Sequence, residues 1–404
     1  MHEPFATGVI CLVVALLLGI SVLASRASRW LRVPIVLIFL VIGMAAGSEG
    51  IGGIAFENYH VAFRVGTAAL VLILFDGGLN TKRAVIKQAL WPATVLASLG
   101  VLGTATLVAL TAHALGLAWN AAMLLGAVVS STDAATVFSV LRGSGLTLHP
   151  RVGAVLEMES GINDPAAVIL TLILTERLLA TASPTATGII IEVVQQIGVG
   201  AIIGFALGYG GRAIIARIPL PAPGLYPVLT LSVALLAFGL CTVLGGSGFL
   251  AVYITGILIG DHDTPTHPWI LLVHDALAWL SQIAMFLMLG LLVFPSRLFA
   301  VAGIGLVLAL ALALIIRPAV VALCLAPFGY RRRDVAFLGW VGLRGAVPIV
   351  LSTVPVLMGA PGAERLFNIV FFIVVVNALI PGATVPWVTR RLGVDQSAGT
   401  LTQS

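Results

Sequence analysis

The chain has 404 residues, of which 60% are apolar and only 9% carry a charge, and its formal net charge is +5. A soluble chain of this length would form two or three domains and would need about a quarter of its residues charged, so most of this surface must face lipid. The composition therefore excludes most enzymes and ordinary nucleic-acid-binding proteins.

Thirteen apolar segments follow one another along the chain and predict an all-α membrane protein with about 13 transmembrane helices. They lie near residues 7–24, 33–47, 61–78, 88–112, 119–141, 153–175, 187–210, 223–244, 247–260, 270–294, 300–325, 334–358 and 366–388. At roughly 20 residues per span they occupy about 260 residues, which leaves no room for a separate soluble catalytic domain.

Lysine and arginine are distributed unevenly between the two sides that these spans define. Fifteen of the 21 lie on one side, namely Arg26, Arg29, Arg32, Lys82, Arg83, Lys87, Arg142, Arg151, Arg212, Arg217, Arg331, Arg332, Arg333, Arg390 and Arg391. Four lie on the other side, namely Arg64, Arg177, Arg297 and Arg365. Because basic loops stay in the cytoplasm, this asymmetry predicts an N-terminus outside and a cytoplasmic C-terminus, and it explains the net charge without nucleic acid.

An odd number of spans also predicts the symmetry of the fold. If the seventh span links two six-helix halves, these halves cross the membrane in opposite senses, as in transporters built from inverted repeats. Such transporters bind their substrates near the midplane, on broken helices that cross one another. The fifth and twelfth spans are the candidates for these broken helices.

The fifth span carries a carboxylate among hydroxyl groups. Asp133 lies about 14 residues from the outer end of the span, close to the midplane. Four hydroxyl side chains surround it in residues 130–136, and they favour a break because they offer the backbone alternative hydrogen bonds. Freed carbonyl groups beside a carboxylate suit a hard cation, whereas a buried Asp bonded to a neighbouring helix is the structural alternative.

The sixth span carries a second deep carboxylate. Asp164 lies about 19 Å along a helix that needs about 30 Å to cross, and Ser160 shares its face at i and i+4. Apolar surroundings at this depth favour the protonated carboxyl group, while a bound monovalent cation favours the ionised one. A proton and a cation would therefore exclude each other at Asp164. A structural Asp before Pro165 is the alternative interpretation.

Two arginines also lie inside predicted spans, where a charge costs about 2.5–3.5 kcal/mol. Arg317 and Glu159 match in depth, so we expect an ion pair that holds the sixth span against the eleventh. Arg344 lies near the midplane of the twelfth span, in a glycine- and proline-containing stretch that favours a broken helix. We expect Arg344 to compensate for the carbonyl ends of the broken helices near Asp133.

Three weaker features complete the set. Asp76 and Glu157 lie toward the cytoplasmic side and are possible residues of the ion pathway. Asp76 has either a helix-end or vestibule role or a role in ion coordination, and Glu157 either lines the cytoplasmic funnel or snorkels toward it. Residues 245–248 match the GxSG pattern of intramembrane serine proteases, but no histidine lies deep in a span to act as the base. We therefore expect no enzymatic activity and no cofactor.

Three segments together resemble the monovalent cation/proton antiporter superfamily, which includes the sodium/proton exchangers. They are residues 131–135 (Ser-Thr-Asp-Ala-Ala), 159–165 (Glu-Ser-Gly-Ile-Asn-Asp-Pro) and 342–348 (Gly-Leu-Arg-Gly-Ala-Val-Pro). Residues 74–79 and 274–295 look like the bacterial potassium/proton branch. The resemblance covers all thirteen spans.

The resemblance implies a role for each matching residue. Asp164 would alternate between proton and cation, with Ser160 and the backbone of Thr132 as further cation ligands. Asp133 would be the supporting carboxylate. Asn163 stands where electrogenic relatives have a second Asp, which implies electroneutral exchange of one cation for one proton.

The resemblance also implies how the chain is divided. Residues 1–392 would form the transmembrane domain, with a core bundle (88–175 and 300–388), a dimerisation scaffold (7–78 and 223–294) and a linker helix (187–210). Residues 393–404 would form a cytoplasmic tail. It further implies a homodimer in the bacterial inner membrane. Members of the potassium branch usually continue into cytosolic regulatory domains, whereas this sequence stops soon after Arg391. It is therefore either a short form or a truncated one, and a possible regulatory domain is absent from this chain.

These features predict a secondary active antiporter that exchanges K⁺ or Na⁺ for H⁺. A sodium-coupled symporter for a small organic solute is the alternative. It would need a larger pocket with groups for that solute, whereas the midplane residues suit a bare ion. A channel of the same architecture would need a continuous polar path or a carbonyl filter, and the sequence contains no such filter.

Overall fold

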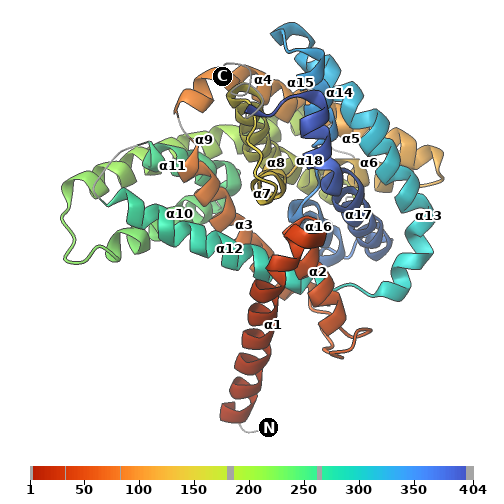
Figure 1. Ribbon diagram of the computed structural model, residues 1–404, viewed down its shortest axis with the longest axis horizontal. Helices are drawn as coiled ribbons and strands as arrows, with labels where there is room; N and C mark the ends of the chain where they lie inside the picture. Colours follow the sequence, from red (N-terminus) through yellow and green to blue (C-terminus); the bar gives the residue numbers. More distant parts are fainter. Residues whose placement is uncertain (1–2, 32, 82, 180–185, 262–265, 397–404) are drawn as a thin grey trace, which may run out of the picture.

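The computed structural model describes residues 3–31, 33–81, 83–179, 186–261 and 266–396. Within these ranges the chain is built from helices and short connections (Figure 1), and its only extended pairings are two isolated bridges. The predicted all-α membrane fold class is confirmed. Arg32 and Lys82 of the charge pattern lie outside the described residues.

The helices follow the predicted spans closely. In chain order they are α1 (Glu3–Leu31), α2 (Ile35–Ala46), α3 (Tyr59–Asn80), α4 (Arg83–Val95), α5 (Val101–Ala114), α6 (Trp119–Val128), α7 (Ala134–Gly143), α8 (Pro150–Leu179), α9 (Ala186–Arg217), α10 (Leu225–Val243), α11 (Gly248–Gly260), α12 (His267–Leu291), α13 (Pro295–Ala311), α14 (Arg317–Leu325), α15 (Arg332–Trp340), α16 (Ala346–Leu357), α17 (Ala363–Asn377) and α18 (Ala383–Leu392). Each predicted span coincides with one helix or with two consecutive ones. Eight helical stretches in the described ranges are long and apolar enough to cross a membrane, and the number thirteen remains a prediction.

Five predicted spans are divided rather than continuous. Three contain a π-helical turn, at Leu96–Gly100, Leu312–Ile316 and Ala378–Gly382. The second of these ends just before Pro318, and the third contains Pro381, so the missing N–H of proline accounts for the local change in pitch. The fifth and twelfth spans are broken outright, between α6 and α7 and between α15 and α16.

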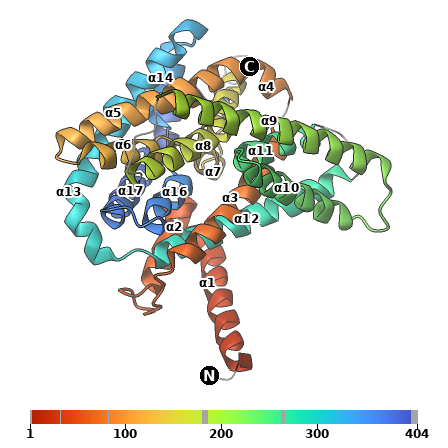
Figure 2. The same cartoon turned by 180° about the vertical axis from the view of Figure 1, so that it is seen from behind.

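The helices form two groups. One contains α1–α3 and α9–α12, the other contains α4–α8 and α13–α18, and they meet along α8. Figures 1 and 2 both show α9, α10 and α11 on one side of the molecule and α5, α6 and α13 on the opposite side. In the first group α11 packs against α3 and α9, and α12 packs against α2 and α3; in the second α5 packs against α6, and α13 against α17. Contacts between α3 and α16, and between α11 and α8, join the two groups.

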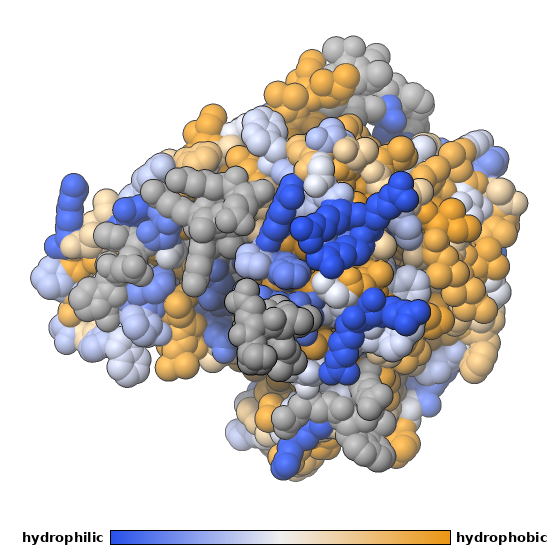
Figure 3. All heavy atoms as spheres, turned by 45° about the horizontal axis from the view of Figure 1, so that its top comes forward, coloured by the Kyte–Doolittle hydropathy of each residue, from blue (hydrophilic) through white to orange (hydrophobic). Residues whose placement is uncertain are grey.

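The outer surface is that of a protein in lipid. Only 6% of the apolar stretch of α1 is buried, and 11% of that of α9. The face at the top of Figure 1 instead carries a central patch of hydrophilic residues, with a hydrophobic flank to its right in Figure 3. A polar face of this kind lies outside the hydrocarbon layer of a bilayer.

A polar link joins the α2–α3 connection to the start of α13. The Glu49 carboxylate accepts hydrogen bonds from the Ser296 hydroxyl and, at 2.8 Å, from the Ser296 backbone N–H. These two hydrogen bonds lower the pKa of Glu49, with a smaller contribution from the charge of Arg297. The carboxylate satisfies a free N–H in the first turn of α13, where negative charge is favoured.

The chain ends against the connection between α7 and α8. After α18, Gly393 takes a left-handed conformation (φ 61°), and residues 393–396 then lie along residues 147–149. His149 N–H donates to Val394 O (3.1 Å) and Gln396 N–H to Thr147 O (2.9 Å). We call residues 393–396 the C-terminal strap. It is the start of the predicted tail, of which residues 397–404 lie outside the described ranges.

Val394 anchors the strap, because its side chain is fully buried in a cluster that includes Leu146 and Leu148. We expect Val394→Ala to lower the free energy of unfolding by about 1–2 kcal/mol, through lost apolar contact and a small cavity. Thermal denaturation in detergent should show a Tm lower by about 2–5 °C. Val243→Ala is the matched control, since Val243 is 83% exposed; an equal Tm for both variants would contradict the anchoring role.

Candidate functional site

The site is built where the two broken helices meet. The break between α6 and α7 lies against the break between α15 and α16, and Asp133 N–H donates to Leu343 O at 2.8 Å. Backbone groups freed inside a membrane need partners from the protein, because lipid supplies none. Each break therefore supplies a hydrogen-bond partner for a backbone group that the other break leaves free.

Asp133 stabilises the break that it occupies. It is the N-cap of α7, and its carboxylate accepts hydrogen bonds from Thr136 N–H (3.0 Å) and from the Thr136 hydroxyl (2.6 Å). A carboxylate at this position favours the helix N-terminus both as a cap and through the helix dipole. Gly345 of the opposite break makes room for it, since a Cβ there would lie 2.0 Å from Asp133 Oδ2.

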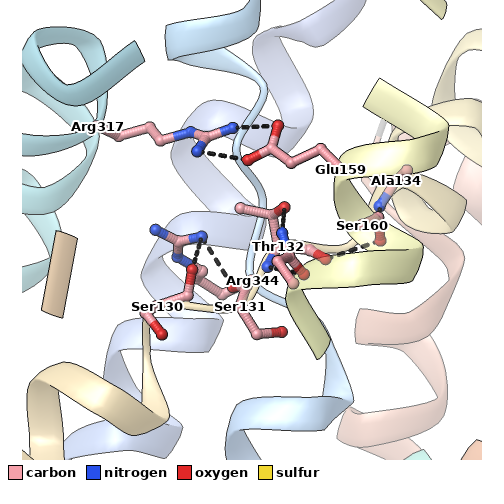
Figure 4. A network of polar contacts seen from close by, with 9 residues as sticks. Ser130, Ser131, Thr132, Ala134, Glu159, Ser160, Arg317 and Arg344 are labelled. Atoms are coloured by element: carbon pink, nitrogen blue, oxygen red, sulfur yellow. Dashed lines mark hydrogen bonds and ion pairs between the residues drawn. The ribbon is translucent and has the colours of Figure 1, made fainter. Parts of the chain in front are cut away.

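Arg344 binds the carbonyl end of α6. Its Nη1 donates to Ser131 O (2.8 Å) and to Ser130 O (3.3 Å) (Figure 4). The side chain is 1% exposed, and its Nε and Nη2 have no hydrogen-bond partner among the described residues. A positive charge next to unpaired carbonyl groups offsets the negative end of a helix, so Arg344 occupies the place expected from its depth.

The middle of α8 supplies the remaining partners of the break. The Ser131 hydroxyl donates to Asp164 Oδ1 at 2.5 Å. The Ser160 hydroxyl donates to Thr132 O (2.8 Å) and accepts from Ala134 N–H (3.1 Å). Ser160 and Asp164, one turn apart on α8, thus both bond to the unwound segment, as their shared face predicts.

Asn163 and Thr132 are hydrogen-bonded to each other. Asn163 Nδ2 donates to the Thr132 hydroxyl (2.5 Å), and Asn163 Oδ1 faces Thr132 N–H (3.4 Å). Both side chains are buried. Neither is among the described residues that line a cavity beside the site. In this arrangement Asn163 braces the unwound segment rather than reaching the cavity, and Thr132 O already accepts from Ser160.

A cavity of about 480 Å³ reaches the site between the two groups of helices. Its walls come from α3, α11 and α12 on one side and from α7, α8 and α16 on the other. Five carboxylates and one arginine are among its described lining residues, namely Asp76, Asp133, Glu157, Asp164, Asp275 and Arg142. This excess of negative charge in a concave site attracts cations.

Asp76 and Glu157 both line this cavity. Asp76 Oδ1 accepts from Asn80 Nδ2 (3.2 Å), and Glu157 Oε1 accepts from the Thr81 hydroxyl (3.3 Å). Asp275, which lines the same cavity from α12, was not among the expected site residues, and neither was the direct bond from Ser131 to Asp164. The run of hydroxyl residues pointed toward Ser131, but the position of Asp275 depends on how α12 packs.

Glu159 and Arg317 form a buried ion pair. The distance from Nη1 to Oε1 is 2.7 Å and that from Nη2 to Oε2 is 2.8 Å, so the contact is bidentate (Figure 4). The two side chains are 1% and 3% exposed. The pair joins α8 to α14, and Gly342 leaves room for the arginine, since a Cβ there would lie 2.5 Å from Arg317 Nε.

Ser247 of the GxSG segment has a structural position. Its side chain caps α11 by accepting from Leu250 N–H (3.4 Å), and its backbone N–H donates to Gln196 O (2.9 Å). A serine engaged as a helix cap does not resemble an activated nucleophile, which needs a neighbouring base. This geometry removes support for the protease interpretation.

Residues 12–391 match the family of transmembrane sodium/hydrogen exchangers. The chain belongs to this family. The resemblance seen in the three sequence segments is thus confirmed.

Several characterised exchangers are similar to the chain over nearly its whole length. It is 45% identical over 389 residues to the K⁺/H⁺ antiporter NhaP of Alkalimonas amylolytica and 44% identical over 387 residues to the K⁺/H⁺ antiporter NhaP2 of Shewanella oneidensis. In both cases the match covers 95% of this chain and 67% of the relative. The Na⁺/H⁺ antiporter NhaS2 of Synechocystis sp. is 25% identical over 94% of this chain and 70% of the relative.

The fold is also that of a known exchanger. The sodium proton antiporter MjNhaP1 of Methanocaldococcus jannaschii, in its structure at pH 8, superposes with a TM-score of 0.82. The match covers 97% of this chain and 99% of the other, at 22% identity. The helical arrangement is therefore shared even where few side chains are.

The buried ion pair generates a stability prediction. Glu159→Gln or Arg317→Met alone leaves one buried charge without its partner, which costs about 3–5 kcal/mol. We expect each single variant to lose most of its monodisperse protein in gel filtration after detergent extraction, and the double variant to recover a substantial part. The exposed pair Arg297–Glu364 (3.2 Å) is the control, and Glu364→Gln should change stability by less than about 1 kcal/mol. A double variant as poorly folded as the singles would reject the pairing.

The close approach of the breaks generates a second prediction. In Gly345→Ala the new Cβ collides with the Asp133 carboxylate, so the crossing must shift and cation-dependent proton flux should fall at least tenfold, as small displacements in a site can do. Gly303→Ala is the control, because a Cβ at Gly303 meets no atom within 4 Å. Flux assays on both proteins in liposomes test this, and full activity of Gly345→Ala would contradict the geometry.

Proposed function

We propose that the chain is a secondary active antiporter that exchanges a monovalent cation, K⁺ or Na⁺, for H⁺ by alternating access. The observation that carries the proposal is the position of Asp164. This carboxylate lies 8% exposed at a cavity lined with further carboxylates, and its Oδ1 accepts a hydrogen bond from Ser131. Family membership and the named activities of the relatives support the same exchange.

Competition at Asp164 would couple the two ions. A protonated Asp164 is neutral and has little attraction for a cation, whereas the ionised carboxylate attracts one, and a cation bound there opposes the return of the proton. Ser160 and Asp133 also line the cavity and offer oxygen atoms of the kind that alkali cations bind. Either ion can then be carried, but not both together.

Alternating access would require the two helix groups to shift. The cavity lies between them, and Leu70 of α3 and Val347 and Val350 of α16 are buried together in the apolar cluster beside it. In the proposal α4–α8 and α13–α18 act as the core bundle that moves, while α1–α3 and α10–α12 act as the scaffold and α9 as the linker. The scaffold would also form the homodimer contact, which would cover part of the exposed apolar surface of α1.

K⁺ is the cation that we propose first. Two relatives at 44–45% identity are named K⁺/H⁺ antiporters, whereas the relative named a Na⁺/H⁺ antiporter is 25% identical. The neutral Asn163 beside Asp164 supports electroneutral exchange of one cation for one proton. No cofactor takes part.

The fifteen-to-four distribution of basic residues supports a cytoplasmic C-terminus and an outer N-terminus, and the bacterial relatives support the inner membrane.

The alternatives have less support in the cavity. A symporter for an organic solute needs groups that recognise it, whereas the charged lining residues are five carboxylates and one arginine. Solute uptake that depends on sodium would revive this alternative. A channel would give flux that does not saturate and is not coupled to protons.

Removing the charge of Asp164 tests the central step. We expect purified Asp164→Asn protein in liposomes to lose K⁺-dependent proton flux by at least 100-fold, because the amide can carry neither the proton nor the charge that attracts the cation. In the unaltered protein the apparent KM for K⁺ should rise by up to about tenfold per pH unit on acidification, as simple mass action between competing ions demands.

Glu364→Gln is the control for this experiment, since Glu364 is an exposed carboxylate outside the cavity. The measurement compares K⁺, Na⁺ and Li⁺ at several pH values, with and without a potential clamped by an ionophore. Exchange that persists in Asp164→Asn would overturn the assignment, and a rate that follows the imposed potential would overturn electroneutrality.

A further inference from the structure

A buried tyrosine faces the site from the scaffold side of the cavity. Tyr253 of α11 is 4% exposed and lines the cavity opposite α8. Its phenol end lies against Gly161, where a Cβ would come within 2.3 Å of Tyr253 Cζ and 2.6 Å of its hydroxyl oxygen. Gly161 follows Ser160 directly and precedes Asp164 by three residues, so the ring lies beside the part of α8 that carries the site.

The hydroxyl of Tyr253 lies in a polar neighbourhood without a hydrogen bond of ordinary geometry to any described residue. The Thr81 side chain lies within reach of the Tyr253 hydroxyl, and the carboxylates of Glu157 and Asp164 lie near it. The Thr81 hydroxyl is itself directed to Gly77 O (2.7 Å) and Glu157 Oε1 (3.3 Å). A buried hydroxyl in such a place is normally satisfied by water or by a ligand.

The backbone that carries this side chain is packed closely against α3. A Cβ on Gly78 of α3 would lie 2.6 Å from Tyr253 O, and one on Gly256 of α11 would lie 2.6 Å from Phe75 O. These close approaches between backbones lock α11 onto α3, since any larger residue at either glycine would force them apart. The segment of α11 that carries the phenol is therefore fixed to α3, and it belongs to the helix group opposite the one that carries Asp164.

We propose that Tyr253 is a positioning residue for the transported cation, whose hydroxyl oxygen takes over part of the cation's hydration between Glu157 and Asp164. The inference rests on the antiport proposed above. A neutral hydroxyl oxygen can replace one water around an alkali cation, and a favourably placed one lowers the free energy of partial dehydration.

This location has a consequence for the two sides of the membrane. Because Tyr253 is on the scaffold and Asp164 is on the core, the hydroxyl adjoins the site in the state that has this cavity. When the core shifts toward the opposite side, Asp164 leaves Tyr253 behind. The contribution of the hydroxyl to cation binding is thus restricted to one face of the membrane.

Tyr253→Phe removes the hydroxyl and keeps the ring, so the packing against Gly161 is preserved. At the membrane face onto which the cavity opens, we expect the apparent KM for K⁺ to rise about 2- to 10-fold. This is the loss of affinity that follows from removing one hydrogen bond or one ligand. The KM at the opposite face and the maximal rate should change less than about twofold. Right-side-out and inside-out membrane vesicles, with K⁺ varied outside and proton flux as the readout, separate the two faces.

Thr255→Val is the matched control. Thr255 lies on the same helix and is fully buried, but its hydroxyl donates to Gly204 O of α9 (3.2 Å), away from the cavity. Its loss should leave KM unchanged at both faces.

The outcomes distinguish this inference from the antiport proposal. An unaltered protein without K⁺-dependent proton flux would defeat the antiport proposal itself. An active protein whose Tyr253→Phe variant keeps its KM at both faces, or raises KM equally at both, would overturn the role of Tyr253 alone, because a purely structural ring predicts the first result and a general disturbance the second.

Discussion

The structure depends on one constraint, which is that a polypeptide in lipid must satisfy its own backbone. Two helices are interrupted at the depth where no water can supply hydrogen bonds. The bond from Asp133 N–H to Leu343 O, the two bonds from Arg344 to carbonyl groups of residues 130 and 131, and the bond from Ser160 to Thr132 O meet this demand. The groups that make the interruption tolerable are the same groups that surround Asp164, so structural support and ion binding cannot be separated here.

The buried positive charges also have partners within the protein. Arg317 is neutralised by Glu159 in a bidentate contact, while Arg344 faces carbonyl groups instead of a carboxylate. One buried positive charge is thus left against the carbonyl end of α6. Breaking a buried pair is far more harmful than never having formed it, which makes the Glu159–Arg317 contact a fixed point between α8 and α14.

Much of this arrangement could be predicted because lipid makes polar residues conspicuous. Asp133, Glu159, Asp164, Arg317 and Arg344 stood out by depth alone, and matched depths indicated which arginine meets Glu159. The structure adds what depth cannot describe, namely rotation about each helix axis and packing between helices. Asn163 is adjacent to Asp164 in sequence, yet it turns toward Thr132 and away from the cavity. Tyr253 gave no signal, because a tyrosine inside a span is unremarkable until α11 is placed against α3 and α8. The sequence suggests an interfacial pair for His274 and Asp275, and the place of Asp275 in the cavity wall follows only from the packing of α12.

The C-terminal strap has a mechanical consequence. Residues 394 and 396 are hydrogen-bonded to the connection that ends α7 and begins α8, and these are the helices that begin at Asp133 and carry Asp164. A force applied to the backbone beyond residue 396 is therefore borne first by this short connection and only afterwards by the helices of the bundle. Tension at residue 396 would therefore reach the helices that hold the two parts of the ion site, without any ligand entering the membrane.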